Sequence, residues 1–129
     1  MTTLWLDLET YSETPINHGT YRYAANAEIM LFAWALDEQP AQVWDLTSDG
    51  PVPFDLESAL LDPEVVVYAH NSMFDRTVMR YAMPDLCPPI ERWRDTMVQA
   101  LCHSLPGALG ALCQVLGVPS DQAKDKDGK

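Results

Sequence analysis

The sequence predicts an α/β fold in which helices pack on a mixed β-sheet. In the first half of the chain, runs of bulky apolar residues alternate with turn residues, which is typical of an antiparallel meander. In the second half, a β-branched run alternates with segments of helical apolar spacing, which indicates parallel strands joined by helices. With 129 residues, 47% of them hydrophobic, the chain is long enough for one domain with its own core.

The first half predicts three strands. Leu4 to Leu8 is an apolar run of strand length, and Glu28 to Leu36 is a longer one rich in bulky residues. Between them, residues 11–26 carry Ser, Pro, Gly and Asn, which predict a loop with one short helical turn. Residues 37–40 supply a turn, after which Ala41 to Leu46 returns as the third strand.

The middle of the chain predicts a helix, a strand and a second helix. Phe54 to Leu61 has the apolar spacing of a short helix. Val65 to Ala69 is a continuous apolar run, which predicts a strand buried on both faces. A helix over Ser72 to Tyr81 follows, with Asn71 placed as its N-cap.

The last part of the chain predicts one strand and two helices. Glu91 to Asp95 is the candidate strand, and the helices span Thr96 to His103 and Gly107 to Leu116. From Pro119 onward the chain is polar and charged, without apolar periodicity. We therefore expect a folded domain over residues 1–118 and a polar tail over 119–129.

Composition restricts the function classes. Nineteen acidic and eight basic residues give a net charge of −11, and no basic stripe of the kind that binds phosphate backbones is present. A metal-dependent nuclease tolerates this acidity because bound cations invert the local charge. The apolar runs are too short to span a bilayer and no signal peptide opens the chain, so we expect a cytosolic protein. Three cysteines without paired spacing predict reduced thiols, rather than a zinc site.

Two carboxylates follow one another along the first strand, in the motif Leu6-Asp7-Leu8-Glu9-Thr10. Residues i and i+2 of a strand point to the same face, so Asp7 and Glu9 lie side by side. Repulsion between two negative charges at this spacing raises the pKa of one of the two carboxyl groups, unless a cation neutralises them. Mg²⁺ and Mn²⁺ prefer such oxygen ligands, so the pair predicts part of a metal site. A lone D-x-E is a weak signal, because acidic pairs also occur by chance.

A second polar motif, AHNSMFD, follows the predicted strand over Val65 to Ala69. Asn71 and Asp75 are four residues apart, so they share one face at the start of the helix. That face lies at the carboxyl end of the strand, where crevices of α/β sheets open. Asn71 can donate to a phosphate and Phe74 can stack on a base. Each also has a structural interpretation: Asp75 on the surface, Asn71 as a cap and Phe74 in the core.

The motifs LDLET, VVVYAHNSMFD and RWRDTMVQA occur in this order over essentially the whole chain. Together they resemble the DEDD, or DnaQ-like, 3′–5′ exonuclease superfamily, and the wider N-terminal pattern is most similar to exonuclease domains of phage-type family A DNA polymerases. The resemblance implies a ribonuclease-H-like fold. It also implies hydrolysis of the 3′-terminal phosphodiester of DNA, with two Mg²⁺ or Mn²⁺ ions and release of 5′-mononucleotides.

The resemblance assigns roles to individual residues. Asp7 would bridge two metal ions, Glu9 would ligate one of them, and Asp75 would hold the other. Asn71 would contact the scissile phosphate. The terminal nucleotide would be contacted by the side chains of Phe74, His70 and Thr10. Asp95 matches a family position that is normally structural, so we do not expect it to bind metal.

The chain departs from the family at the third motif, in which a Tyr or His precedes a final Asp as Y-x3-D or H-x4-D. No such spacing follows Asp95, so the site is expected to be incomplete and the chain truncated, with weak metal binding and weak or no cleavage. The expected partners are a single-stranded or frayed DNA 3′ end and a polymerase domain of the parent chain. Two alternatives stay open: a catalytically silent module that binds a basic partner, and an RNase of the same superfamily.

Overall fold

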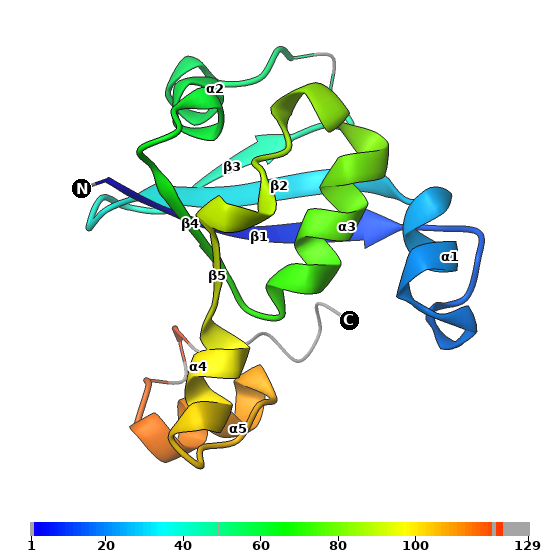
Figure 1. Cartoon of the computed structure of the whole chain (residues 1–129). Coiled ribbons are helices and arrows are strands. Elements are labelled where there is room, and N and C mark those ends of the chain that lie inside the picture. Colours follow the sequence, from blue (N-terminus) through cyan, green and yellow to red (C-terminus); the bar gives the residue numbers. More distant parts are fainter. Residues whose placement is uncertain (1, 49, 120, 123–129) are drawn as a thin grey trace.

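A single five-stranded sheet forms the centre of the protein (Figure 1). The computed structural model describes residues 2–48, 50–119 and 121–122. The strands run in the order β3-β2-β1-β4-β5 across the sheet. Their bounds are β1 Thr3–Tyr11, β2 Glu28–Leu36, β3 Gln42–Asp45, β4 Val66–Ala69 and β5 Trp93–Asp95.

The pairing is mixed, as the sequence predicted. β1 is antiparallel to β2 and β2 is antiparallel to β3, which makes the expected meander. β4 is parallel to both β1 and β5. The fold is therefore the ribonuclease-H-like α/β arrangement, with β1 in the middle of the sheet.

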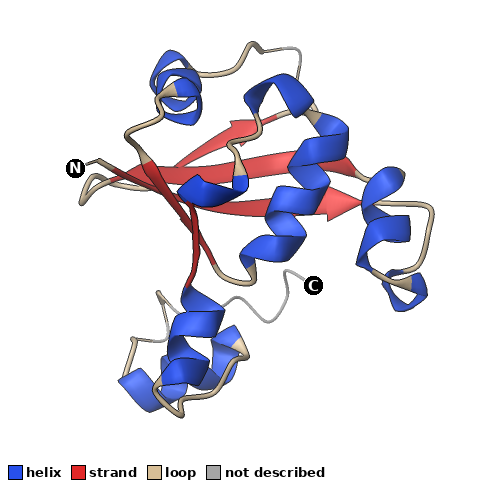
Figure 2. Cartoon of the chain, viewed as in Figure 1, coloured by secondary structure: helices blue, strands red, loops and turns tan. Residues whose placement is uncertain are grey.

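The helices alternate with the strands of the second half (Figure 2). Their bounds are α1 Thr20–Ala25, α2 Phe54–Leu61, α3 Ser72–Ala82, α4 Thr96–Cys102 and α5 Leu109–Leu116, with 3-10 turns η1 Ile16–His18, η2 Pro84–Leu86 and η3 Ile90–Arg92. The segment expected to be mainly a loop, residues 11–26, thus contains a six-residue helix. β1 also runs three residues past the predicted end at Leu8.

One face of the sheet, here called the covered face, carries the core. Paired residues of neighbouring strands, such as Leu8 and Phe32, point to the same face of the sheet. The pairing register therefore shows which residues of each strand belong to which face. The covered face consists of Leu4, Leu6, Leu8, Phe32, Trp34, Val67, Ala69 and Trp93, all buried. Helix α3 packs across it with Val78 and Met79 fully buried (Figure 1).

The opposite face, here called the open face, is not buried by the described elements. It carries Trp5, Asp7, Glu9, Ala33, Val43, Val66, Tyr68 and Arg94. Trp5 is 42% exposed and stacks on Tyr68, with 4.7 Å between ring centroids. The prediction that the strand after residue 64 is buried on both faces is therefore wrong. Val66 and Tyr68 are only half-buried, because no described helix covers their side of the sheet.

A buried arginine joins the end of α2 to the sheet. The side chain of Arg92 donates to the carbonyl oxygens of Val65 at 2.9 Å, Leu60 at 2.6 Å and Ala59 at 2.8 Å. Two of these carbonyls belong to the last turn of α2, where backbone acceptors lack partners within the helix. Burial lowers the pKa of Arg92, while the charge of Asp62 raises it.

The C-terminal helices form a small unit of their own beside β5 (Figure 1). Ala100 and Leu112 are buried there but lie outside the main core cluster. The three cysteines are free thiols, as predicted. Within the described ranges, none of the helices has both the length and the apolar character that crossing a membrane requires. The expected polar tail, 119–129, falls mostly outside the described residues.

Candidate functional site

The unequal lengths of two parallel strands create the position of the candidate site. β4 pairs with β1 only from Thr3 to Trp5, whereas β1 continues to Tyr11. Beyond Trp5, the edge of β1 on this side is left to the segment that follows β4. That segment is the first turn of α3, which carries Asp75. Asp75 therefore lies beside the middle of β1, at the carboxyl end of the parallel strands.

Asp75 is a buried carboxyl group with a strongly shifted pKa. It is only 4% exposed, and its pKa is raised from 3.8 to about 8. Burial is the largest cause, and the nearby negative charge of Asp7 is the second. Asp95 raises the pKa further, while backbone hydrogen bonds from Asp75 itself and from Leu8 lower it. The structure thus brings together two carboxyl groups that the sequence separates by 68 positions.

Glu9 lies on the same face of β1 as Asp7, two residues further along, and its side chain is exposed. The Cα atoms of such a pair are about 7 Å apart. Over residues 2–48, 50–119 and 121–122, no three His, Cys, Asp or Glu side chains are arranged to hold a metal ion. The close pair is therefore Asp7 with Asp75, and Glu9 stands beside it without completing a threefold cluster.

Asp95 fixes the turn that carries the second motif. Its carboxylate accepts from the backbone N–H groups of Asn71 and Ser72, each at 2.9 Å, and from that of Met97 at 2.8 Å. Asp95 thus caps α3 and α4 together, which is the structural role that the resemblance implied. Asn71 occupies the predicted N-cap position, but its own side chain makes no capping hydrogen bond. Its backbone is left-handed, with φ of 64°.

Tyr23 of α1 connects two of the candidate substrate contacts. Its hydroxyl group shares a hydrogen bond of 2.9 Å with the hydroxyl of Thr10 at the end of β1. Its ring packs against that of Phe74, with 5.8 Å between centroids. Phe74 itself is half-buried and packs against the core. Thr10 and Phe74 therefore lie at one end of the site, held by the same tyrosine.

His70 bridges the end of β4 to the C-terminal helices. Nδ1 shares a hydrogen bond of 2.9 Å with the Thr96 hydroxyl, and Nε2 lies 2.6 Å from the carbonyl oxygen of Gly107. A carbonyl only accepts, so Nε2 carries a proton. Both ring nitrogens have partners within the chain, which leaves the face of the imidazole for the predicted contact with a nucleotide.

Sequence reasoning missed Tyr23 as a member of this site. The residue stands in a segment that reads as a loop, and its contacts are with β1 and α3, far away in the sequence. Thr96 and Gly107, the partners of His70, were missed for the same reason. The DTM motif around Asp95 was the one usable signal, because Asp before a helix predicts a cap.

The chain is similar in sequence to one curated protein of known function. It is 35% identical to the DNA polymerase of Bacillus phage SP02 over 132 aligned positions, which include the whole of this chain. The chain covers 20% of that relative's length. No protein-family model matches the sequence.

Two solved structures have a similar fold. One is NrnC from Brucella melitensis with bound Mg²⁺, at a TM-score of 0.66 and 17% identity, covering 95% of this chain and 57% of that one. The other is the EXO domain of Nibbler from Aedes aegypti, at a TM-score of 0.56 and 13% identity, covering 79% and 46%.

The order of the motifs, the mixed sheet and the match to a phage DNA polymerase agree with one another. The two solved structures show the fold that the sequence predicted, and the similarity to a phage DNA polymerase agrees with the resemblance of the motifs to the DEDD, or DnaQ-like, exonuclease superfamily.

Proposed function

We propose that the chain is a metal-dependent 3′–5′ exonuclease domain that proofreads for a DNA polymerase in a phage or bacterial cytosol. The observation that carries the proposal is the approach of the buried carboxyl group of Asp75 to Asp7, whose side chain is exposed on the open face. Burying one carboxyl group beside a second negative charge costs free energy, and a divalent cation between the two groups would offset this cost. The similarity to a phage DNA polymerase supports the substrate class and the parent protein.

The donor set fits Mg²⁺ or Mn²⁺ in kind, because all three candidate groups are carboxylates. Asp7 and Asp75 would hold the ions, and Glu9 would reach them from the same face of β1. When bound, the ions would activate water and stabilise the departing 3′ oxygen. The described residues do not complete a site, so we expect weak metal binding by this chain.

The remaining residues would hold the terminal nucleotide. The exposed amide of Asn71, in the left-handed turn before α3, would donate to a phosphate oxygen. Phe74 and Thr10, which both contact Tyr23, would contact the terminal base and sugar, and His70 would contribute a further contact with the terminal nucleotide. Hydrolysis would break the P–O3′ bond and give a 5′-mononucleotide and a strand shorter by one nucleotide.

A cleavage assay tests this function. Single-stranded DNA labelled at its 5′ end is incubated with the chain and Mn²⁺, and the products are separated by length. We expect slow shortening from the 3′ end that EDTA and Asp7→Asn both abolish. Asp55→Asn, which makes the same change on the exposed surface of α2, should leave the rate unchanged. Cuts inside the strand, or cleavage that survives Asp7→Asn, would contradict the proposal.

The absence of a threefold metal cluster among the described residues favours one alternative, a silent module that binds a basic partner. In that case neither cleavage nor an effect of Mn²⁺ on the unfolding temperature would be seen. An RNA strand of the same sequence distinguishes the RNase alternative, because only a nuclease that accepts the 2′-hydroxyl would shorten it.

A further inference from the structure

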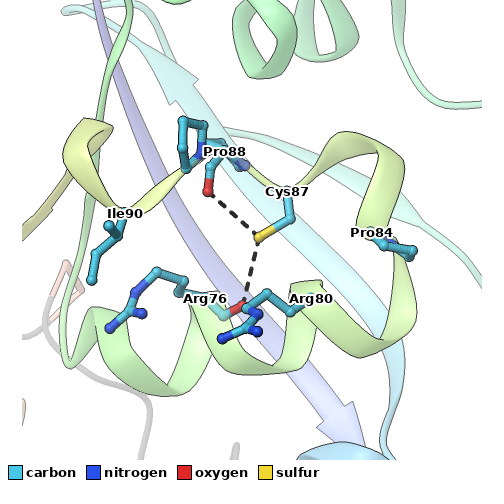
Figure 3. A pocket seen from close by; sticks show the side chains of 7 residues that line it. Arg76, Arg80, Pro84, Cys87, Pro88 and Ile90 are labelled. Atoms are coloured by element: carbon cyan, nitrogen blue, oxygen red, sulfur yellow. Dashed lines mark hydrogen bonds between the residues drawn. The ribbon is translucent and has the colours of Figure 1, made fainter.

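A hollow of about 460 Å³ lies between α3 and the segment that follows it (Figure 3). Two arginines of the helix, Arg76 and Arg80, form one wall, and Cys87, Pro88 and Ile90 lie on the facing segment. The Cys87 thiol donates to the carbonyl oxygens of Arg76 and Pro88, each at 3.6 Å. These bonds, and the fixed φ angles of the neighbouring prolines, hold the facing segment against the helix.

Two of the few basic side chains of this acidic chain line the hollow. All three lysines lie beyond residue 122, so the described residues contain only five Lys or Arg side chains, all arginines. Arg92 and Arg94 bind backbone carbonyls. Within the described part of the chain, by contrast, neither Arg76 nor Arg80 forms a side-chain hydrogen bond or ion pair. Nε of Arg76 is buried and has no acceptor.

The lining selects the charge of a ligand. No carboxylate lines the hollow, and both guanidinium charges are close enough to act on the Cys87 thiol. Burial raises the pKa of that thiol, so it stays neutral and adds no negative charge. The guanidinium groups of Arg76 and Arg80, one helical turn apart, have hydrogen-bond donors for which the lining provides no acceptor. The fork of a guanidinium matches the oxygens of a phosphate group.

We propose that Arg76 and Arg80 bind a backbone phosphate of the nucleic-acid strand. This inference rests on the proposed function, because it takes the substrate of that site as the ligand. Arg76 directly follows Asp75, and Arg80 lies about 6 Å beyond Arg76 along the helix axis. A strand whose 3′ end reaches Asp75 would place a neighbouring phosphate within reach of the pair. The site would supply affinity that the net charge of −11 opposes.

Fluorescence anisotropy of a labelled oligothymidylate tests the site. The titration is done in EDTA, so that the metal-dependent site does not contribute, and is repeated over a range of salt concentrations. We expect Arg80→Gln to weaken binding about tenfold at low salt. The slope of log K against log salt should fall by about 0.7, which is the change expected for one phosphate contact with a single strand. Arg94→Gln, the same change of charge on the open face, is the matched control.

Equal binding by Arg80→Gln and Arg94→Gln would overturn the inference, and so would an absence of DNA binding by the wild type. Inorganic phosphate separates the two sources of the ligand. Phosphate could raise the unfolding temperature of the wild type but not that of Arg80→Gln, while both proteins bind DNA equally. In that case the hollow binds free phosphate rather than DNA, and the inference fails. The cleavage assay is read separately, so activity lost in Asp7→Asn supports the nuclease even where the arginine site fails.

Discussion

Asp7 of β1 raises the pKa of Asp75 on α3, across the edge of β1 that β4 leaves unpaired. This contact joins the two acidic motifs of the sequence at one place. It also makes the stability of the metal-free protein depend on pH in a way that can be measured.

Asp75→Asn should stabilise the metal-free protein, and more so at pH 8 than at pH 5. The folded pKa of about 8 lies above the ordinary 3.8, so between these values the folded state keeps a proton that the unfolded chain loses. Stability therefore falls as pH rises through this range, by at most about 1.4 kcal/mol per pH unit. Urea unfolding in EDTA at both pH values measures the effect. An unchanged pH slope in the variant would show that Asp75 does not titrate in this range.

Mn²⁺ should have the opposite pH dependence. A cation binds the ionised form of Asp75, so it has to displace the proton, and its stabilising effect should grow as pH rises from 5 to 8. The unfolding temperature with and without Mn²⁺ measures this directly. Asp75→Asn should lose most of the effect, whereas Asp85→Asn on the exposed surface should retain it. Stabilisation of equal size at both pH values would argue against binding at Asp75.

Asp95→Ala should destabilise the protein by about 2–4 kcal/mol. The change removes an acceptor shared by three backbone N–H groups at the starts of α3 and α4. Because Ser72 leads directly into the turn that carries Asp75, any Mn²⁺ response should weaken as well. Asp85→Ala, in the exposed 3-10 turn, should change stability by less than about 0.5 kcal/mol. Equal unfolding midpoints in urea for the two variants would contradict this role of Asp95.

Arg92→Met should cost at least about 3 kcal/mol, because it leaves three buried carbonyl oxygens without their donor. The methionine retains much of the apolar volume, so the loss reports the hydrogen bonds rather than a cavity. Arg94→Met is the control, since its carbonyl contacts lie near the surface and its loss should cost under about 1 kcal/mol. Chemical denaturation of both variants measures the difference. Similar midpoints would show that the buried hydrogen bonds of Arg92 do not contribute to stability.

Tyr23→Phe separates two functions of one side chain. The ring contact with Phe74 is retained, and the hydrogen bond with the Thr10 hydroxyl is lost. We expect a cost of about 1 kcal/mol in stability and slower cleavage wherever activity is measurable. Tyr21→Phe, which alters an exposed ring on the same helix, is the control and should change neither. A loss of activity in both variants would point to α1 as a whole rather than to this hydroxyl.

The sequence allowed most of the sheet to be predicted because its strands carry local signals. The run from Glu28 to Leu36 and the turn after it define a hairpin, and the apolar run at Val65 precedes a helix with clear periodicity. The helix α1 was predicted only as a short helical turn in a loop, since six residues are too few to form a stable helix by themselves, whatever their propensity. Its position depends on contacts with α3 that no local pattern contains.

Within the candidate site, the two acidic motifs could be found and their approach could be expected from topology. The pairing register could not, and it decides where Asp75 falls along β1. The capping of α4 by Asp95 has a local signal, but its hydrogen bond with Asn71 has none, and the hydrogen bonds of His70 involve partners 26 and 37 positions away. Such long-range hydrogen bonds depend on the whole fold, so a single sequence does not specify them.

The open face has a practical consequence for experiments in solution. Trp34, Trp44 and Trp93 point to the covered side of the sheet, and Trp5 alone among the tryptophans points to the other. Its indole is accessible and stands two residues from Asp7 on the same side of β1. The emission that a water-soluble quencher removes should therefore come mainly from this indole. The fluorescence of Trp5 should therefore report the binding of a ligand to the open face.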